Sequence, residues 1–176
     1  DELSFYPFLY WPITPAQKTP TADELQKLNR YLKGGGLILF DTKDADISKF
    51  GQSTIEAQTL REITAGINLP PLSLISRDHV LTRSFYLLQE FPGRYAGTEV
   101  WLEASSAKEN TINKKAFRNP NDGVTPVIIG GNDWASAWAV DNSGQPLLPV
   151  GRGVSGERQR EIALRFGINL IMHVLT

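Results

Sequence analysis

The chain has 176 residues, of which 41% are hydrophobic and 21% are charged, as is typical of one globular domain. Eighteen basic and 19 acidic residues give a formal net charge of -1, so there is no excess positive field to hold a nucleic-acid backbone. The absence of cysteine excludes disulfides, thiolate metal sites and cysteine nucleophiles. No apolar run is long enough for a membrane span, and the two ends predict that residues 1–176 form a single domain of a longer protein.

The first half of the chain alternates predicted strands and helices. Residues 3–11 predict a strand, in which Pro7 favours an edge position or a bend. Residues 21–24 form a capping box before an amphipathic helix that the glycines 34–36 end. The apolar run 37–40 then predicts a central strand that helices cover on both faces.

The alternation of helix and strand continues to residue 75, and the pattern changes after residue 99. Residues 54–65 predict a second helix and residues 72–75 a short strand, so the order of elements implies a parallel sheet with right-handed crossovers. Residues 104–123 predict a polar surface loop. Three later segments predict strands joined by turns, which we expect to add antiparallel strands: 100–103, 126–129 and 134–140.

Residues 156–176 predict a largely buried helix with two apolar flanks and one polar stripe. One flank is Ile162, Phe166, Leu170 and Val174, and the second is Leu164, Ile168, Ile171 and Leu175. The polar stripe, which we interpret as a solvated face, is Arg158, Glu161, Arg165, Asn169 and His173. Glu161 and Arg165 have the spacing of an i,i+4 ion pair.

Together these elements predict an α/β fold: a three-layer sandwich around a mostly parallel central sheet, similar to flavodoxin, with antiparallel additions in the C-terminal half. In such sheets ligands bind outside the carboxyl ends of the strands, and three polar clusters follow predicted strands. The candidate ligand-binding residues are Asp41, Thr42, Lys43, Asp44, Arg77, Asp78, His79, Asn132, Asp133 and Trp134. The alternative interpretation is that Asp41 and Asp133 only cap turns and helix starts.

Other motifs carry weaker signals. Residues 151–156 match G-x-G-x-x-G before a helix, but no strand and acidic residue follow at the dinucleotide-binding spacing, so a flexible connector is favoured over an anion site with Arg152, Arg158 and Arg160. Residues 105–108 match the serine acylase pattern S-x-x-K without its partner motifs, which indicates a chance match. With only two histidines, His79 and His173, we expect no zinc, no other metal and no cofactor.

Longer segments carry a resemblance that spans nearly the whole chain. They are residues 5–13, 37–42, 77–81, 85–86, 131–139, 156–161 and 165–170. In these segments the chain resembles an uncharacterised bacterial domain family found at the C-terminal end of membrane-anchored, aerotolerance-type (Bat-like) proteins and in shorter exported proteins. The resemblance implies a fold like that of class I glutamine amidotransferases, in which a cysteine nucleophile follows a central strand. Asp41, Thr42 and Lys43 occupy that place here.

A carboxylate at that place is poorly suited to acyl transfer, and Thr42 has no identifiable base beside it, so we expect no amidotransferase activity. The leading hypothesis is a non-enzymatic domain that binds a small polar ligand or a partner protein at the edge formed by Asp41, Asp78 and Asp133. Its parent protein is expected to be membrane-associated through segments outside this chain, with the extracytoplasmic side favoured.

Two alternatives stay open. The first is a hydrolase acting on a sugar or peptide bond, with Asp41 or Asp133 as general base and His79 as general acid. The second is a structural role, in which the four tryptophans and five tyrosines form an exposed aromatic patch that docks onto neighbouring domains.

Overall fold

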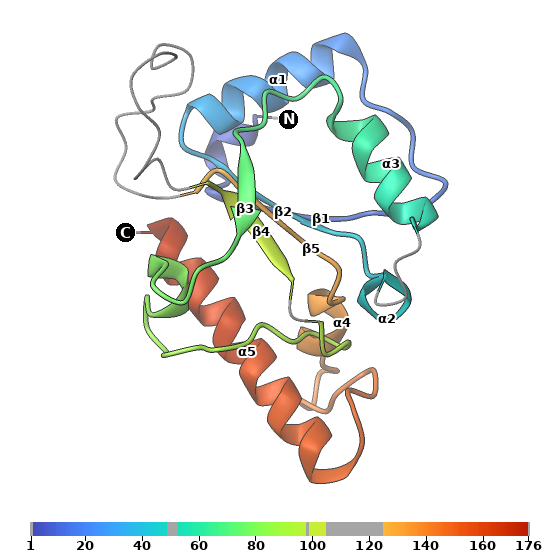
Figure 1. Ribbon diagram of the computed structural model, residues 1–176, viewed down its shortest axis with the longest axis vertical. Coiled ribbons are helices and arrows are strands. Elements are labelled where there is room, and N and C mark those ends of the chain that lie inside the picture. Colours follow the sequence, from blue (N-terminus) through green and yellow to red (C-terminus); the bar gives the residue numbers. More distant parts are fainter. Residues whose placement is uncertain (1, 49–52, 98, 105–124, 176) are drawn as a thin grey trace.

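The computed structural model describes residues 2–48, 53–97, 99–104 and 125–175, and shows a mixed α/β fold around one five-stranded sheet (Figure 1). The strand order is β1-β2-β5-β4-β3. β1, β2 and β5 are parallel, whereas β4 runs antiparallel to both β5 and β3. The strands are β1 (Phe8–Pro12), β2 (Leu37–Asp41), β3 (Leu72–Leu74), β4 (Val100–Glu103) and β5 (Val127–Gly130).

Helix α1 (Ala22–Lys33) follows the local signals of the sequence. The Thr21 hydroxyl accepts from the Glu24 backbone N–H, and the Glu24 carboxylate accepts from the Thr21 N–H, which completes the predicted capping box. Gly34 ends the helix as expected. Gly36 lies against the ring of Tyr31, where a Cβ atom would come within 2.2 Å of Tyr31 Cζ, so the return into β2 requires glycine.

Helices lie on both faces of the sheet, and β2 is buried between two apolar clusters. On one face α1 and α3 (Ile55–Thr64) pack against Ile38 and Phe40. On the other face α5 (Gly153–Leu175) and the short 3-10 helix η2 (Val80–Thr82) pack against Leu37 and Leu39. This two-sided burial confirms the prediction for residues 37–40, although β2 is the second strand of five and the centre is β5.

Four sequence-based predictions differ from the structure. Residues 3–5 form a 3-10 helix, η1 (Leu3–Phe5), and the first strand begins only at Phe8. Residues 127–130 add a strand parallel to β2 rather than an antiparallel one. β3 pairs antiparallel with β4 at the far edge of the sheet, so it does not extend the parallel part as the alternation of elements implied. The segment 134–140 forms helix α4 (Trp134–Trp138) instead of a strand, because Trp134 and Ala137, three residues apart, both turn into the core.

Helix α5 also buries a different face from the one that the sequence predicts. Asn169 and His173, which belong to the predicted solvated face, are almost fully buried, and the second apolar flank faces solvent. Asn169 is buried because its amide makes four hydrogen bonds to the backbone of residues 81, 85 and 86. The Glu161–Arg165 ion pair is confirmed, with 2.5 Å between the charged atoms. Among the described residues no helix is both long and apolar enough to span a membrane.

Candidate functional site

Asp41 is the last residue of β2, and its side chain is completely buried. Its carboxylate accepts four hydrogen bonds. Oδ2 accepts from the Tyr10 hydroxyl at 2.6 Å and from the Trp134 backbone N–H at 2.9 Å. Oδ1 accepts from the backbone N–H groups of Lys43 and Asp133, both at 3.1 Å. One carboxylate therefore ties together β1, the loop after β2 and the start of α4.

Burial determines the protonation states of Asp41 and Tyr10. Loss of water raises the pKa of Asp41, and the hydrogen bonds from Tyr10 and the three backbone N–H groups act in the opposite direction. Burial, together with the neighbouring Asp41 carboxylate, also raises the pKa of Tyr10 strongly. Tyr10 thus stays a protonated hydrogen-bond donor at every physiological pH.

The rest of the loop after β2 is held by its own hydrogen bonds. Lys43 has a left-handed backbone conformation with φ of 56°. The buried Asp44 carboxylate accepts from the hydroxyls of Thr42 and Thr54. The Ala45 N–H donates to the Gly131 carbonyl at 2.9 Å, which fastens this loop, before the short helix α2 (Ala45–Ser48), to the end of β5. The Thr42 hydroxyl thus donates to the Asp44 carboxylate and to the Gly130 carbonyl, two contacts that hold the loop in place.

Residues 132–134, which follow β5, lie at the same edge of the sheet as Asp41. Asp133 has φ of 53°, and its carboxylate accepts from the Ser136 hydroxyl at 2.8 Å and lies 3.8 Å from Arg94 Nη1. The Asn132 side-chain amide and the Trp134 indole N–H both donate to the Phe91 carbonyl. The predicted clusters 41–44 and 132–134 are thus in direct contact, and most of their polar groups serve the fold.

The third predicted cluster lies elsewhere. After β3 the chain turns back towards the C-terminal part of α5 (Figure 1). The ring of His79 lies 5.9 Å from that of His173. His173 Nε2 accepts from the N–H of Thr125, which precedes β5, whereas Asp41 pairs with Gly130 at the other end of that strand. Arg77 and Asp78 are exposed beside them. The three clusters consequently do not share one edge.

Desolvation lowers the pKa of His79, whose Nδ1 accepts from the Leu81 backbone N–H at 3.2 Å. In the part of the chain that the structure describes, no group of three or more histidine, aspartate or glutamate side chains has the arrangement of a metal site. The histidine pair thus contributes to the packing of η2 against α5.

The glycine-rich segment 151–156 precedes and begins helix α5. Gly151 and Gly153 have positive φ, and Gly156 packs against the Val150 carbonyl, where a Cβ atom would come within 2.1 Å. The glycine-rich segment therefore serves a close turn into α5. Arg160 donates to the carbonyls of Ala137 and Leu148. Residues 105–108 lie outside the described residues.

The aromatic-patch hypothesis loses most of its support, since of the four tryptophans only Trp101 is exposed, at 38%. Trp134 is completely buried, and Trp11 and Trp138 are partly buried against the apolar clusters. Trp138 also donates its indole N–H to the Ala163 carbonyl of α5 at 2.8 Å. These three tryptophans belong to the core and its margin.

Sequence reasoning missed two members of the site, Tyr10 and Arg94. Tyr10 lies in the predicted first strand, but strand periodicity says only which face a side chain occupies. Arg94 belongs to an irregular segment whose backbone N–H donates to the Asp133 carbonyl. Neither residue has a local sequence signal that connects it to Asp41 or Asp133.

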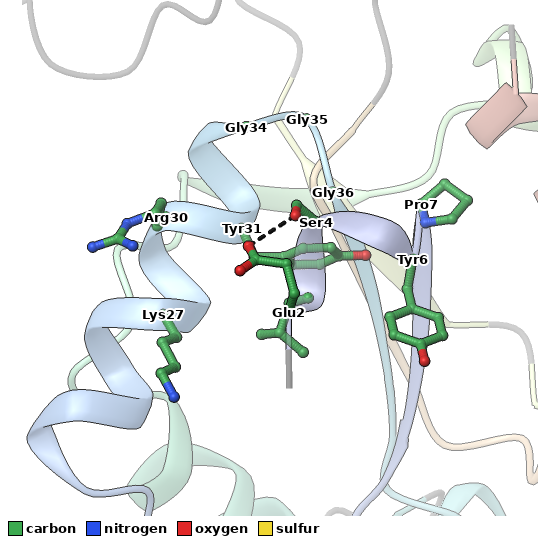
Figure 2. Close-up of a pocket in the computed structure, with 11 residues that line it drawn as sticks. Glu2, Ser4, Tyr6, Pro7, Lys27, Arg30, Tyr31, Gly34, Gly35 and Gly36 are labelled. Carbon is green, nitrogen blue, oxygen red and sulfur yellow. Dashed lines mark hydrogen bonds between the residues drawn. The ribbon is translucent and has the colours of Figure 1, made fainter.

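Two hollows among the described residues lie away from this edge. Figure 2 shows one of about 570 Å³ between η1 and α1, where Arg30 extends outward and Ser4 donates to Glu2. The second, of about 260 Å³, lies on the outer face of α5. Neither is lined by residues of the 41–44 or 132–134 clusters.

Comparison with known proteins assigns a family without an activity. A search of the curated proteins found no match. One family model matches residues 1–175, nearly the whole chain, and its description is a domain of unknown function. The chain therefore belongs to the DUF4159 family.

Proposed function

We propose that this domain is a non-enzymatic recognition domain that binds a partner protein at the edge where β2 and β5 end. The observation that carries the proposal is the state of Asp41: its buried carboxylate already accepts four hydrogen bonds and so has no free lone pair directed at a substrate. In our proposal, which follows the sequence resemblance, Asp41 takes the place that the nucleophile has in class I glutamine amidotransferases. In our proposal the amidotransferase-like scaffold is kept and the reaction is absent.

Two of the side chains left for recognition at this edge are cationic. The Asp41 and Asp133 carboxylates face inward, while the Arg94 side chain is 36% exposed and Lys43 is half-buried. The backbones beside both cations converge on Asp41 and Asp133, which fixes the relative position of their Cα atoms. A pair of cations on a rigid backbone suits an acidic segment of a partner protein.

The hydrolase alternative required His79 beside Asp41 or Asp133. His79 instead packs near the beginning of β5, whereas both aspartates lie at its end. The acid–base pair that this alternative requires is therefore not assembled, and the recognition role is the better supported one. We further propose, from the family resemblance, that the domain acts on the extracytoplasmic side of a membrane-associated protein.

A photoreactive amino acid placed at Lys43 of the full-length protein, in its native cells, tests the recognition role. We expect a discrete crosslinked product that disappears when Arg94→Glu is added. The matched control places the same group at Lys27, an exposed lysine of α1. Equal crosslinking at both positions, or none at Lys43, would contradict the proposal.

Chromogenic glycosides and peptide p-nitroanilides test the absence of catalysis separately. We expect no turnover above the buffer rate. If the folded wild type shows turnover and a still folded Asp133→Asn variant does not, the hydrolase alternative would be supported.

A further inference from the structure

The outer face of α5 is apolar although it points away from the sheet. Leu164, Ile168 and Ile171 are 44%, 42% and 46% exposed, and Leu175 is 67% exposed. Together with Gly167 and Met172, the first three line an open hollow of about 260 Å³. We call the residues Leu164, Ile168, Ile171 and Leu175 the outer stripe.

Folding of the monomer does not account for the outer stripe. The inner face of α5 already carries Phe166 and Leu170 into the core, and even Asn169 and His173 are buried there. The helix therefore buries polar side chains inside and shows leucine and isoleucine outside. A contiguous apolar surface of this kind on a folded domain marks an interaction site.

The spacing of the stripe identifies the kind of occupant. Its members follow one another at intervals of four, three and four residues, which is the a/d seam of a helix that packs along another helix. Residues 166–175 contain no aspartate, glutamate, lysine or arginine, so the seam carries no charge that would have to be buried. The charged residues of α5 lie towards its other end, at positions 157–165.

We propose that a second copy of this chain covers the outer stripe, with the two α5 helices packed antiparallel about a two-fold axis. The stripe is symmetric about the point between residues 169 and 170. Leu164 therefore lies level with Leu175 of the second copy, and Ile168 lies level with Ile171 of the second copy. Such matching of like with like is what an isologous interface requires.

Charge favours the same arrangement. In the antiparallel register Arg165 lies level with Val174 of the second copy, so no like charges meet. The segment 157–161 falls outside the overlap. A parallel pair would instead place Glu161 and Arg165 level with their own copies, and like charges would repel.

The small contact area between the two α5 helices limits the affinity of the dimer. Twelve residues of helix extend over roughly 18 Å, and a contact of that length buries less than the roughly 1,200 Å² of a standard interface. We therefore expect a reversible dimer with a Kd on the order of 10–100 μM, which membrane anchoring of two copies would strengthen by raising their local concentration.

Sedimentation velocity of the 176-residue chain, from micromolar to about millimolar concentration, tests the proposal. We expect a monomer–dimer equilibrium that Ile168→Glu weakens at least tenfold. The matched control is Val154→Glu: Val154 is 82% exposed and lies two heptads before Ile168 on the same helix, outside the overlap. It should leave the equilibrium unchanged. A wild type that stays monomeric, or two variants with equal effects, would overturn the proposal, as would binding of vesicles by a monomeric wild type.

Disulfide trapping tests the register, since the chain has no native cysteine. A mixture of Ile168→Cys and Ile171→Cys chains should oxidise to the mixed dimer in preference to either homodimer. Circular dichroism of each reduced variant checks that it is folded. A dominant Ile168→Cys homodimer would indicate parallel packing and overturn the antiparallel arrangement.

Discussion

Substitution of Asp41 by asparagine separates a structural carboxylate from a catalytic one. The amide has almost the same shape, but its NH2 group replaces one of two oxygens that each accept two hydrogen bonds. The less costly orientation turns the NH2 group towards Tyr10, whose hydroxyl can rotate and accept. The buried N–H of Trp134 then loses its acceptor.

The size of the effect follows from that lost contact. A buried unpaired N–H costs about 1–3 kcal/mol, and the remaining bonds weaken because their acceptor is no longer charged. Removal of the buried charge offsets part of this loss, since burial disfavours the ionised carboxylate. We expect the free energy of unfolding to fall by about 2 kcal/mol, a shift of about 1 M in the urea midpoint for an m-value near 2 kcal/mol/M.

Urea unfolding followed by tryptophan fluorescence measures this change, and Asp46→Asn is the control. Asp46 is an exposed acid five residues further on, so its substitution changes the net charge equally. We expect that control to stay within about 0.5 kcal/mol of the wild type. An equally small effect of Asp41→Asn would refute the structural role of the carboxylate.

The remaining predictions concern pH and the buried face of α5. Burial raises the pKa of Asp41 above its ordinary 3.8, so the folded state keeps the proton to higher pH than the unfolded chain does. The difference in unfolding free energy between wild type and Asp41→Asn should therefore shrink as the pH rises from 3.8 through the pKa of the folded state. Urea titrations at several pH values check this, and a growing difference would contradict it. Burial lowers the pKa of His79 below 6.5, so the unfolded chain takes up the proton first, and stability should fall as pH drops through 6.5. His79→Asn, which keeps an acceptor for the Leu81 N–H, should flatten that dependence, and an unchanged slope would count against it. Asn169→Leu removes four hydrogen bonds and should lower the unfolding free energy by about 3–5 kcal/mol in the same assay, whereas a loss below about 1 kcal/mol would show that the contacts are replaced.

Local signals predicted much of the N-terminal half. The capping box at Thr21 and Glu24, the glycine stop at Gly34 and the apolar run 37–40 each specify a structure through neighbours in the chain. The segment 134–140 misled because alanine occupies every second position, at 135, 137 and 139, which imitates a period of two although Trp134 and Trp138 are four residues apart. Trp134 instead packs against Gly130 and donates its indole N–H to the distant Phe91 carbonyl, and these contacts favour a helix.

The candidate site was predictable in part. The rule that ligands gather at the carboxyl ends of parallel strands brought together residues 41–44 and 132–134, which do meet. It failed for His79, because the chain after β3 turns back to bury Leu81 under α5. The hydrogen bond of Tyr10 to Asp41 joins positions 31 residues apart, and nothing in either local sequence specifies it.

Amide hydrogen exchange at Asp133 and Trp134 tests the closed network around Asp41 most directly. Both N–H groups donate to the buried carboxylate, so we expect them to exchange only when the whole domain unfolds, with the same free energy that urea denaturation gives. Exchange as fast as in an exposed loop would show an edge open to water, as in a working active site, and would contradict the structural role assigned to Asp41.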